Sequence, residues 1–366
     1  MSTEYLRIRT SDRSSYKRCR RKWDIISPVR RNLEYDGVAN ALWWGSGVHF
    51  AMEDYHGYKK FPDMAAALAA YADAFDDDKR PLEWMDIIDQ ATAMLDYYVQ
   101  WLKPRNEYKT LWIDGVPQVE VEFELLLPIE SPDPKYKGVT YHGTLDKVVC
   151  EINNPDRWWI EDYKTAAAID IAKLETDGQI TAYLWGAEQH YQHPIEGVIY
   201  TQISKSPPEY PRMLTKGGIS TDKRQRTTHT LYRAALLEQF PDGVFPNQYI
   251  PFLNDLAAME TLEGNKFIRW DKVTRNDAAK RNFYLNMLGE AAEMVNPLLP
   301  IYPNPTRDCA WDCPARSICL ATDDGGDPEY LLKEEFKERL EGKDPWRKNI
   351  KWPMQTQEQL EAQLLE

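Results

Sequence analysis

Several features are missing from this sequence of 366 residues, and each absence excludes a class of protein. No apolar run approaches the ~18 residues that a membrane-spanning helix needs, so no membrane partner is expected. Residues 1–10 are too charged for a signal peptide, which predicts a cytoplasmic protein. No Gly-x-x-x-x-Gly-Lys-Ser/Thr loop occurs, which argues against an ATP-driven motor within this chain.

Cysteine is also scarce, and its five residues do not suggest a disulfide framework. Cys309, Cys313 and Cys319 crowd into one short C-x3-C-x5-C loop. Such a loop buries little by itself, so thiolates that converge on zinc or on an iron–sulfur cluster would hold it. Both groups normally take four ligands, which leaves Cys19 or Cys150 as the fourth. Cys150 ends an apolar run that is typical of a core strand, so Cys19 is the better candidate.

Positive charge is in deficit overall, because the net charge is −13. Taken alone, this value argues against a nucleic-acid partner. The charge is segregated, however: residues 1–31 carry +7, residues 203–234 carry +5, and the remainder carries −25. Such local basic stretches can attract a polyanion, although either stretch alone could equally be an ordinary solvated surface.

Apolar residues make up 43% of the chain, which is ample for a folded core. The spacing of these residues indicates helices over 11–29, 47–55, 64–75, 82–101 and 176–190. Alternating or continuous apolar runs indicate strands over 119–127, 139–150, 157–165 and 197–203. This order predicts a mixed α/β fold.

The rest of the chain gives weaker signals. A basic, Gly- and Pro-containing loop precedes a helix near 228–239, and a charged helix is expected over 328–341. We therefore expect four regions: a helical region at 1–110, a core at 111–300 with a basic loop at 203–234, a cysteine loop at 301–325, and a charged helical tail at 326–366.

Two neighbouring strands carry the residues best suited to chemistry. Asp146 and Asp162 could chelate hard divalent cations, and Lys164 lies on the same sheet face as Asp162 because strand side chains alternate. A bare Asp-x-Lys is more often an exposed ion pair, so the surrounding motifs must decide whether Asp162 and Lys164 form a catalytic site. His49 lies in the helix that begins near Gly47, and Gln179-x-x-x-Tyr183 places an amide and a phenol one helical turn apart.

The order of these motifs resembles the RecB-like branch of the PD-(D/E)XK nuclease superfamily. The matching pieces are Gly45-Ser-Gly-Val-His49, Gly143-x-x-Asp146, Asp162-Tyr-Lys164 and Gln179-x-x-x-Tyr183. Cys19 and the later three cysteines resemble the iron–sulfur staple of AddB-type and CRISPR-adaptation nucleases and of phage-encoded relatives. The chain has C-x3-C where that family often has C-x2-C.

The resemblance implies a restriction-endonuclease-like mixed sheet flanked by helices, and a metal-dependent nuclease. His49, Asp146, Asp162 and the backbone carbonyl of Tyr163 would hold Mg²⁺ or Mn²⁺. Lys164 would position and activate the attacking water, with Gln179 and Tyr183 steadying substrate and strand. Glu53 would be an outer partner of His49. Cys19, Cys309, Cys313 and Cys319 would hold a structural [4Fe–4S] cluster, with zinc as the alternative.

The expected substrate is DNA, cut by an exonuclease from single strands or duplex ends. The expected contact residues are Arg18, Arg20, Arg21, Lys22, Lys216, Lys223, Arg224 and Arg226. A helicase or recombination protein is a further candidate partner. Two other interpretations stay open: a catalytically silent DNA-binding or recombination-partner module that keeps the fold, and a zinc-stapled RNA or restriction-type endonuclease.

Overall fold

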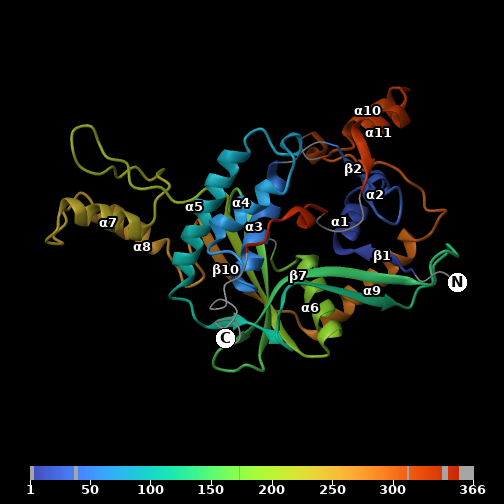
Figure 1. Cartoon of the computed structure of the whole chain (residues 1–366), viewed down its shortest axis with the longest axis horizontal. Coiled ribbons are helices and arrows are strands. Elements are labelled where there is room, and N and C mark those ends of the chain that lie inside the picture. Colours follow the sequence, from blue (N-terminus) through green and yellow to red (C-terminus); the bar gives the residue numbers. More distant parts are fainter. Residues whose placement is uncertain (1–3, 37–39, 173, 311–312, 340–344, 354–366) are drawn as a thin grey trace.

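A computed structural model describes residues 4–36, 40–172, 174–310, 313–339 and 345–353. A mixed seven-stranded sheet lies at its centre (Figure 1). The strands are β1 (Leu6–Arg9), β3 (Tyr108–Thr110), β6 (Val119–Leu127), β7 (Val139–Glu151), β8 (Trp158–Ala166), β9 (Ile195–Ser204) and β10 (Ile268–Val273). Strand β7 runs parallel to β1 and antiparallel to β3, β6 and β8. Strand β9 is parallel to β8, and β10 is antiparallel to β9.

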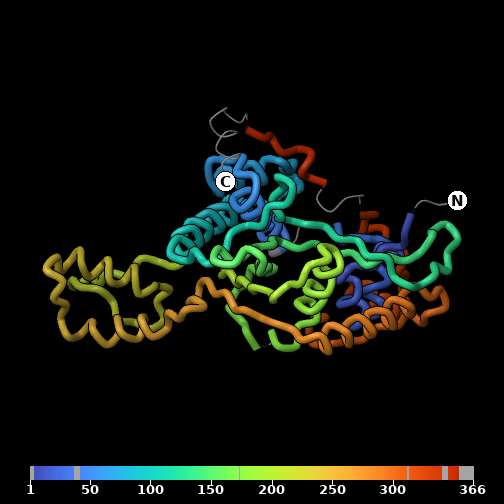
Figure 2. Tube along the Cα trace, turned by 90° about the horizontal axis from the view of Figure 1, so that it is seen from below, coloured from blue at the N-terminus to red at the C-terminus, as the bar shows by residue number. Residues whose placement is uncertain are grey.

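Helices cover both faces of the sheet, as Figure 2 shows. One layer contains α3 (Asn40–His56), α4 (Met64–Asp73) and α5 (Trp84–Leu102). The other contains α1 (Thr10–Arg18), α6 (Gly178–Tyr191) and α9 (Asp277–Met294). Each layer closes over its own apolar cluster, which includes Tyr98 and Ile199 on the first face and Leu145 and Met287 on the second. The sheet is therefore buried on both faces.

Phe123 fixes the distance between the sheet and α6. Its ring lies against Gly143 on β7 and against Gly186 on α6. A Cβ atom at Gly143 would lie 2.4 Å from the ring, and one at Gly186 would lie 2.5 Å from it. Only glycine permits this approach, so Gly143 of the Gly-x-x-Asp motif has a packing role.

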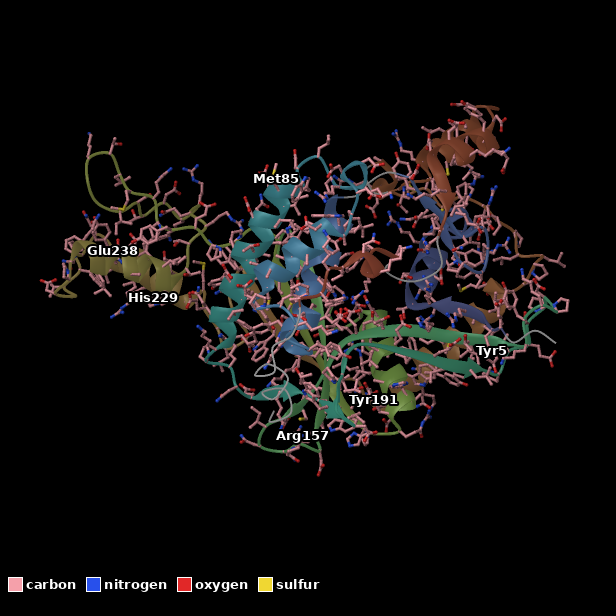
Figure 3. The ribbon with its side chains drawn as sticks, viewed as in Figure 1. Tyr5, Met85, Arg157, Tyr191, His229 and Glu238 are labelled. Carbon is pink, nitrogen blue, oxygen red and sulfur yellow. The ribbon has the colours of Figure 1, made fainter. Side chains whose placement is uncertain are left out.

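An arm of residues 205–267 is inserted between the neighbouring strands β9 and β10. It contains α7 (His229–Gln239) and α8 (Ile250–Ala258), which enclose a separate apolar cluster around Tyr232 and Phe252. The two ends of the arm lie side by side, because Ser204 N–H donates to the Phe267 carbonyl at 2.7 Å. Figures 1 and 2 show the arm projecting from the body, and Figure 3 places His229 and Glu238 at the opposite end of the molecule from Tyr5.

Short elements complete the fold. Strand β2 (Leu33–Tyr35) pairs with β11 (Phe336–Glu338), which joins the carboxyl-terminal region to the amino-terminal one. The others are α2 (Arg20–Ile26), β4 (Trp112–Ile113), β5 (Val116–Pro117), α10 (Arg316–Asp323), α11 (Pro328–Glu335) and the 3₁₀ turns η1 (Asp77–Lys79), η2 (Arg307–Ala310) and η3 (Pro345–Asn349). Within the described ranges, no helix combines the length and apolar content that crossing a membrane requires.

The mixed α/β fold predicted from the sequence is confirmed, and two of the expected helices differ. The helix expected over 11–29 is interrupted at Cys19, whose backbone is extended at φ −162° and ψ 114°. The Asn304 side chain donates to the Arg18 carbonyl at 2.9 Å, so a distant segment satisfies the end of α1. The helix expected over 328–341 ends at Glu335, because the following residues pair with β2.

Candidate metal-binding active site

Three side chains from three elements converge beside the sheet. His49 comes from α3, Glu120 from β6 and Asp146 from β7, and one ligand atom of each lies within 4.8 Å of the other two. His49 Nδ1 lies 3.5 Å from Glu120 Oε1 and 3.6 Å from Asp146 Oδ1. Burial lowers the pKa of His49, but the Asp146 and Glu120 carboxylates outweigh it and hold that pKa above its ordinary value. Oxygen and imidazole ligands of this kind suit a divalent cation.

Glu120 was missed from the sequence, where residues 119–127 were predicted only as a strand and its acidic residues were given no role. The β6–β7 register pairs Val119 with Lys147 and Val121 with Leu145, which places Glu120 opposite Asp146. Glu120 also has φ +48°, in the left-handed region that non-glycine residues rarely adopt. Once β6 and β7 are taken as a hairpin, the register is the signal that could have singled out this residue.

Strand β8 adds Asp162 and Lys164 to the site. Asp162 is only 2% exposed, and its Oδ1 accepts a hydrogen bond from Lys164 Nζ at 2.8 Å. The backbone N–H of the intervening Tyr163 donates to Asp146 Oδ2 at 2.8 Å, which ties β8 to the carboxylate on β7. Tyr163 thus contacts Asp146 through its backbone N–H. A role for its backbone carbonyl as a metal ligand stays a prediction.

The charge states of Asp162 and Lys164 follow from burial and from neighbouring charges. Burial raises the pKa of Asp162 to about 6, against the opposing effect of Lys164. Burial alone would lower the pKa of Lys164, but Asp162 and Asp146 raise it above its usual range. Lys164 is therefore an ammonium at neutral pH, able to donate hydrogen bonds but not to accept a proton.

Asp162 Oδ2 is buried and has no hydrogen-bond partner among the described residues. A buried carboxylate oxygen without a donor is costly, and a cation is one way to satisfy it. Asp162 lies outside the group of three, but Asp146 and His49 both influence its pKa, so it borders that group. The donor set of His49, Glu120, Asp146 and Asp162 fits the divalent cation that the sequence predicted.

Helix α6 brings Gln179 and Tyr183 together as expected. Gln179 Nε2 donates to Tyr183 Oη at 2.6 Å. Burial, followed by the charge of Asp162, raises the pKa of Tyr183 above its usual range. The phenol is therefore neutral and keeps its own proton to donate.

A second buried network, also missed from the sequence, lies under the site on the opposite sheet face. Lys147 and Glu161 form an ion pair at 2.6 Å, with both side chains at most 6% exposed. Thr201 Oγ1 donates to Glu161 at 2.9 Å, and Lys147 Nζ lies 5.4 Å from the centre of the Tyr163 ring. These contacts hold β7, β8 and β9 in register beneath Asp146 and Asp162.

The cysteines lie around the start of α2 and the loop after α9. Asn304 N–H donates to Cys19 Sγ at 3.4 Å, and Thr306 N–H donates to Cys309 Sγ at 3.3 Å. The hydrogen bonds from Thr306 lower the pKa of Cys309. Burial raises the pKa of Cys313, and both Cys309 and Cys319 lie near enough to raise it further.

No three of these sulfur atoms lie within 4.8 Å of one another in the described part of the chain. Tetrahedral zinc with Zn–S bonds of about 2.3 Å would bring its sulfurs to roughly 3.8 Å apart. The cysteine sulfurs in the described part of the chain therefore lie farther apart than they would around tetrahedral zinc. Cys150 is buried in the core, in agreement with its expected structural role.

The basic residues expected to contact DNA fall into two groups at opposite ends of the long axis (Figure 1). Near α1 and α2, Arg18 forms an ion pair with Asp308 at 3.6 Å, and Arg20 forms one with Glu293 at 3.2 Å. Arg21 and Lys22 follow on α2.

The second group lies on the arm. Lys223 pairs with Asp255 at 2.6 Å, and Arg224 pairs with Asp222 at 2.8 Å. Arg226 donates to the Ser206 carbonyl. Lys216 lies in the turn of a short hairpin that is closed by a bridge between Met213 and Ile219. The structure does not gather the eight residues into one patch.

The sequence and the fold were compared with known proteins. Residues 10–320 match the family model of the PD-(D/E)XK nuclease superfamily. No curated protein matches the sequence. One similar solved structure is that of a protein from Eubacterium rectale assigned as an exonuclease, with 14% identity, coverage of 76% of this chain and 88% of that one, and a TM-score of 0.34. Because the family match spans most of the chain, this protein belongs to the PD-(D/E)XK nuclease superfamily.

Proposed function

We propose that the chain is a divalent-metal-dependent deoxyribonuclease that acts as an exonuclease on single-stranded DNA or duplex ends. One observation carries the proposal: the group of His49, Glu120 and Asp146 borders the Asp162–Lys164 pair. The same arrangement contains cation ligands and a fixed ammonium, which are the parts needed to hydrolyse a phosphodiester.

His49, Glu120, Asp146 and Asp162 would hold the cation, and the imidazole favours Mn²⁺ over Mg²⁺. When bound, such a cation supplies Lewis acidity toward a phosphoryl oxygen and lowers the pKa of a coordinated water. The Tyr163 N–H keeps Asp146 oriented by holding its Oδ2, which leaves Oδ1 facing His49.

Lys164 contributes as a hydrogen-bond donor. Its ammonium, anchored on Asp162, can orient the attacking water and stabilise negative charge that develops on the phosphate. Tyr183 accepts from Gln179 and can donate its own proton to a phosphate oxygen. The two α6 residues would thereby position the substrate beside Lys164.

We also propose that Cys19, Cys309, Cys313 and Cys319 hold a structural [4Fe–4S] cluster. Backbone N–H groups already donate to the sulfurs of Cys19 and Cys309, and such hydrogen bonds are characteristic of ligating thiolates.

The nuclease proposal is tested on end-labelled DNA. With Mn²⁺, the wild-type protein should shorten single strands or duplex ends, and Lys164→Met should reduce the rate by about 10²–10⁴-fold, because the side chain keeps its length but loses the ammonium. Lys109→Met, on β3, is the matched control and should retain activity. Comparing 5′- and 3′-labelled substrates gives the polarity.

Two outcomes would redirect the interpretation. DNA binding without any cleavage in Mg²⁺ or Mn²⁺ would indicate a catalytically silent DNA-binding module. Cleavage of closed circular DNA would indicate an endonuclease instead of an exonuclease.

The cluster proposal has its own measurements. Protein purified without oxygen should contain iron and sulfide and absorb in the visible range, and Cys309→Ser should lose both signals. Stoichiometric zinc without iron would contradict it.

A further inference from the structure

The segment Pro345–Pro353 lies beyond the end of the family match and packs onto the helix that carries His49. Trp346, in η3, packs its ring into an aromatic cluster formed by α3, α4 and the residues just after α4. Its ring centre lies 4.7 Å from that of Tyr71, 5.4 Å from that of Phe50 and 5.9 Å from that of Phe75. We call this segment the strap.

Contacts from Arg347, Asn349 and Ile350 also attach the strap. Arg347 forms an ion pair with Glu53 of α3 at 2.6 Å, and the Arg347 guanidinium also lies 5.6 Å from the centre of the Phe50 ring. Asn349 Nδ2 donates to the Ala74 carbonyl at 2.9 Å. Ile350 is 7% exposed and belongs to the apolar cluster under α3–α5. Mixed polar and apolar anchoring of this kind fixes position as well as adding stability.

The strap contacts α3 at the residues that flank the metal-site histidine. Phe50 directly follows His49, and Glu53 lies one turn later on the same helix face as His49. The Glu53 side chain is 16% exposed, and the ion pair shows that Arg347 neutralises it. Glu53 thus pairs with Arg347, and His49 faces Glu120 and Asp146. A contact between Glu53 and His49 stays a prediction.

Tyr71 of α4, which packs against Trp346, also contacts the start of α3. Tyr71 Oη donates to the Trp43 carbonyl at 3.0 Å. Its ring also lies against Gly47, where an added Cβ would be 3.0 Å away. Trp346 therefore supports α3 indirectly on the amino-terminal side of His49 as well as directly on the carboxyl-terminal side.

We propose that Trp346 and Arg347 are positioning residues for the metal site, acting through Phe50 and Glu53 to hold His49 against Glu120 and Asp146. This inference rests on the metal-dependent function proposed above. Losing Arg347 would remove the 2.6 Å ion pair that anchors Glu53, a largely buried carboxylate one turn from His49. The helix would then shift or the carboxylate would compete for the cation, and either change weakens the site.

The test measures Mn²⁺ affinity by calorimetry on the full chain, without DNA, well below the unfolding temperature. Arg347→Met should weaken Mn²⁺ binding by about 10-fold or more, the usual effect of losing a residue that orients a ligand. Arg347→Lys should recover part of the affinity, and Trp346→Phe should weaken it less than Trp346→Leu. The matched control is Arg31→Met, which removes another 2.6 Å ion pair, with Glu329, and should leave the affinity unchanged.

A double-mutant cycle tests the route through Glu53. If Arg347 acts by neutralising Glu53, Arg347→Met should have little further effect in a Glu53→Gln background. An unchanged Mn²⁺ affinity in Arg347→Met and in Trp346→Leu, with only a lowered melting temperature, would overturn the inference. A wild-type protein with no Mn²⁺ affinity, or a His49→Ala variant that binds as tightly as wild type, would instead overturn the proposed metal site.

Discussion

Glu120 offers a carboxylate suited to binding a metal, but its backbone adopts the unfavourable left-handed conformation. A non-glycine residue in the left-handed region costs about 1–2 kcal/mol, and here its carboxylate crowds together with that of Asp146 and the imidazole of His49. Such strain is tolerated where the surrounding structure holds the residue in place. The β6–β7 register does so, because Val119 and Val121 are both paired with β7 on either side of Glu120.

This conformation gives a prediction for the metal-free protein. Glu120→Gly should be about 1 kcal/mol more stable to urea than Glu120→Ala in EDTA, because only glycine relieves the backbone strain. Both variants should lose most of the stabilisation that Mn²⁺ gives the wild type, since a ligand is gone. Unfolding curves with and without Mn²⁺ measure both effects. An alanine variant as stable as the glycine variant would show that the backbone is unstrained.

Part of the site could be predicted from the sequence at this scale. His49, Asp146, Asp162, Lys164, Gln179 and Tyr183 lie in motifs whose spacing is local, and the structure brings them into one neighbourhood. Glu120 could not be found this way, because alternation assigns a face of a strand but not the residue across from it. Arg347 was equally hidden, since it is distant in sequence from Glu53.

At the scale of elements, the packing of α6 on the sheet depends on Phe123 and two glycines. Gly186→Ala should destabilise the protein by about 1–3 kcal/mol, because the new methyl group would overlap the Phe123 ring. Adding Phe123→Leu should recover part of the loss by making room. Denaturant unfolding measures the stability, and the rate of DNA cleavage reports whether Gln179 and Tyr183 have moved.

A matched control for this substitution exists on α9. A Cβ atom at Gly289 would meet no atom within 4 Å, so Gly289→Ala should be neutral or stabilising by up to about 1 kcal/mol through helix propensity. Equal effects of the two substitutions would contradict the packing role of Gly186.

Helices and strands could be predicted where the apolar residues keep one repeat spacing along the whole element. Strands β6 to β9 and helix α6 follow their apolar patterns closely. The break at Cys19 was not predictable, because it depends on Asn304 reaching the Arg18 carbonyl from a distant segment. Strand β1 was missed as well: it has only four residues, and its partner is the distant Val139–His142 part of β7.

For the whole molecule, the arm is separable from the body in two respects. It has its own apolar cluster, and its ends meet at the Ser204–Phe267 hydrogen bond. We predict that replacing residues 206–265 with an Asn-Gly turn leaves the body folded and able to bind Mn²⁺, because β9 and β10 can then form a tight hairpin. The truncated protein should bind DNA more weakly and with a smaller salt dependence, since basic contacts are removed.

Anisotropy titrations of labelled DNA across a salt series measure both quantities. A full-chain variant, Lys216→Ala with Lys223→Ala, separates loss of charge from loss of the arm. Unchanged affinity and salt slope in both proteins would exclude the arm from DNA binding.

The pairing of β1 with β7 also determines the order in which the chain can fold. Leu6 and Ile8 pair with Val139 and Tyr141, and Arg13 on the following helix forms a 2.7 Å ion pair with Glu290. During synthesis, the first strand must wait for β7 to emerge, and α1 must wait for α9. Contacts so distant in sequence slow folding. The basic segment around β1 and α1 leaves the ribosome well before β7 and α9 do, yet it cannot be fixed in place until both have followed.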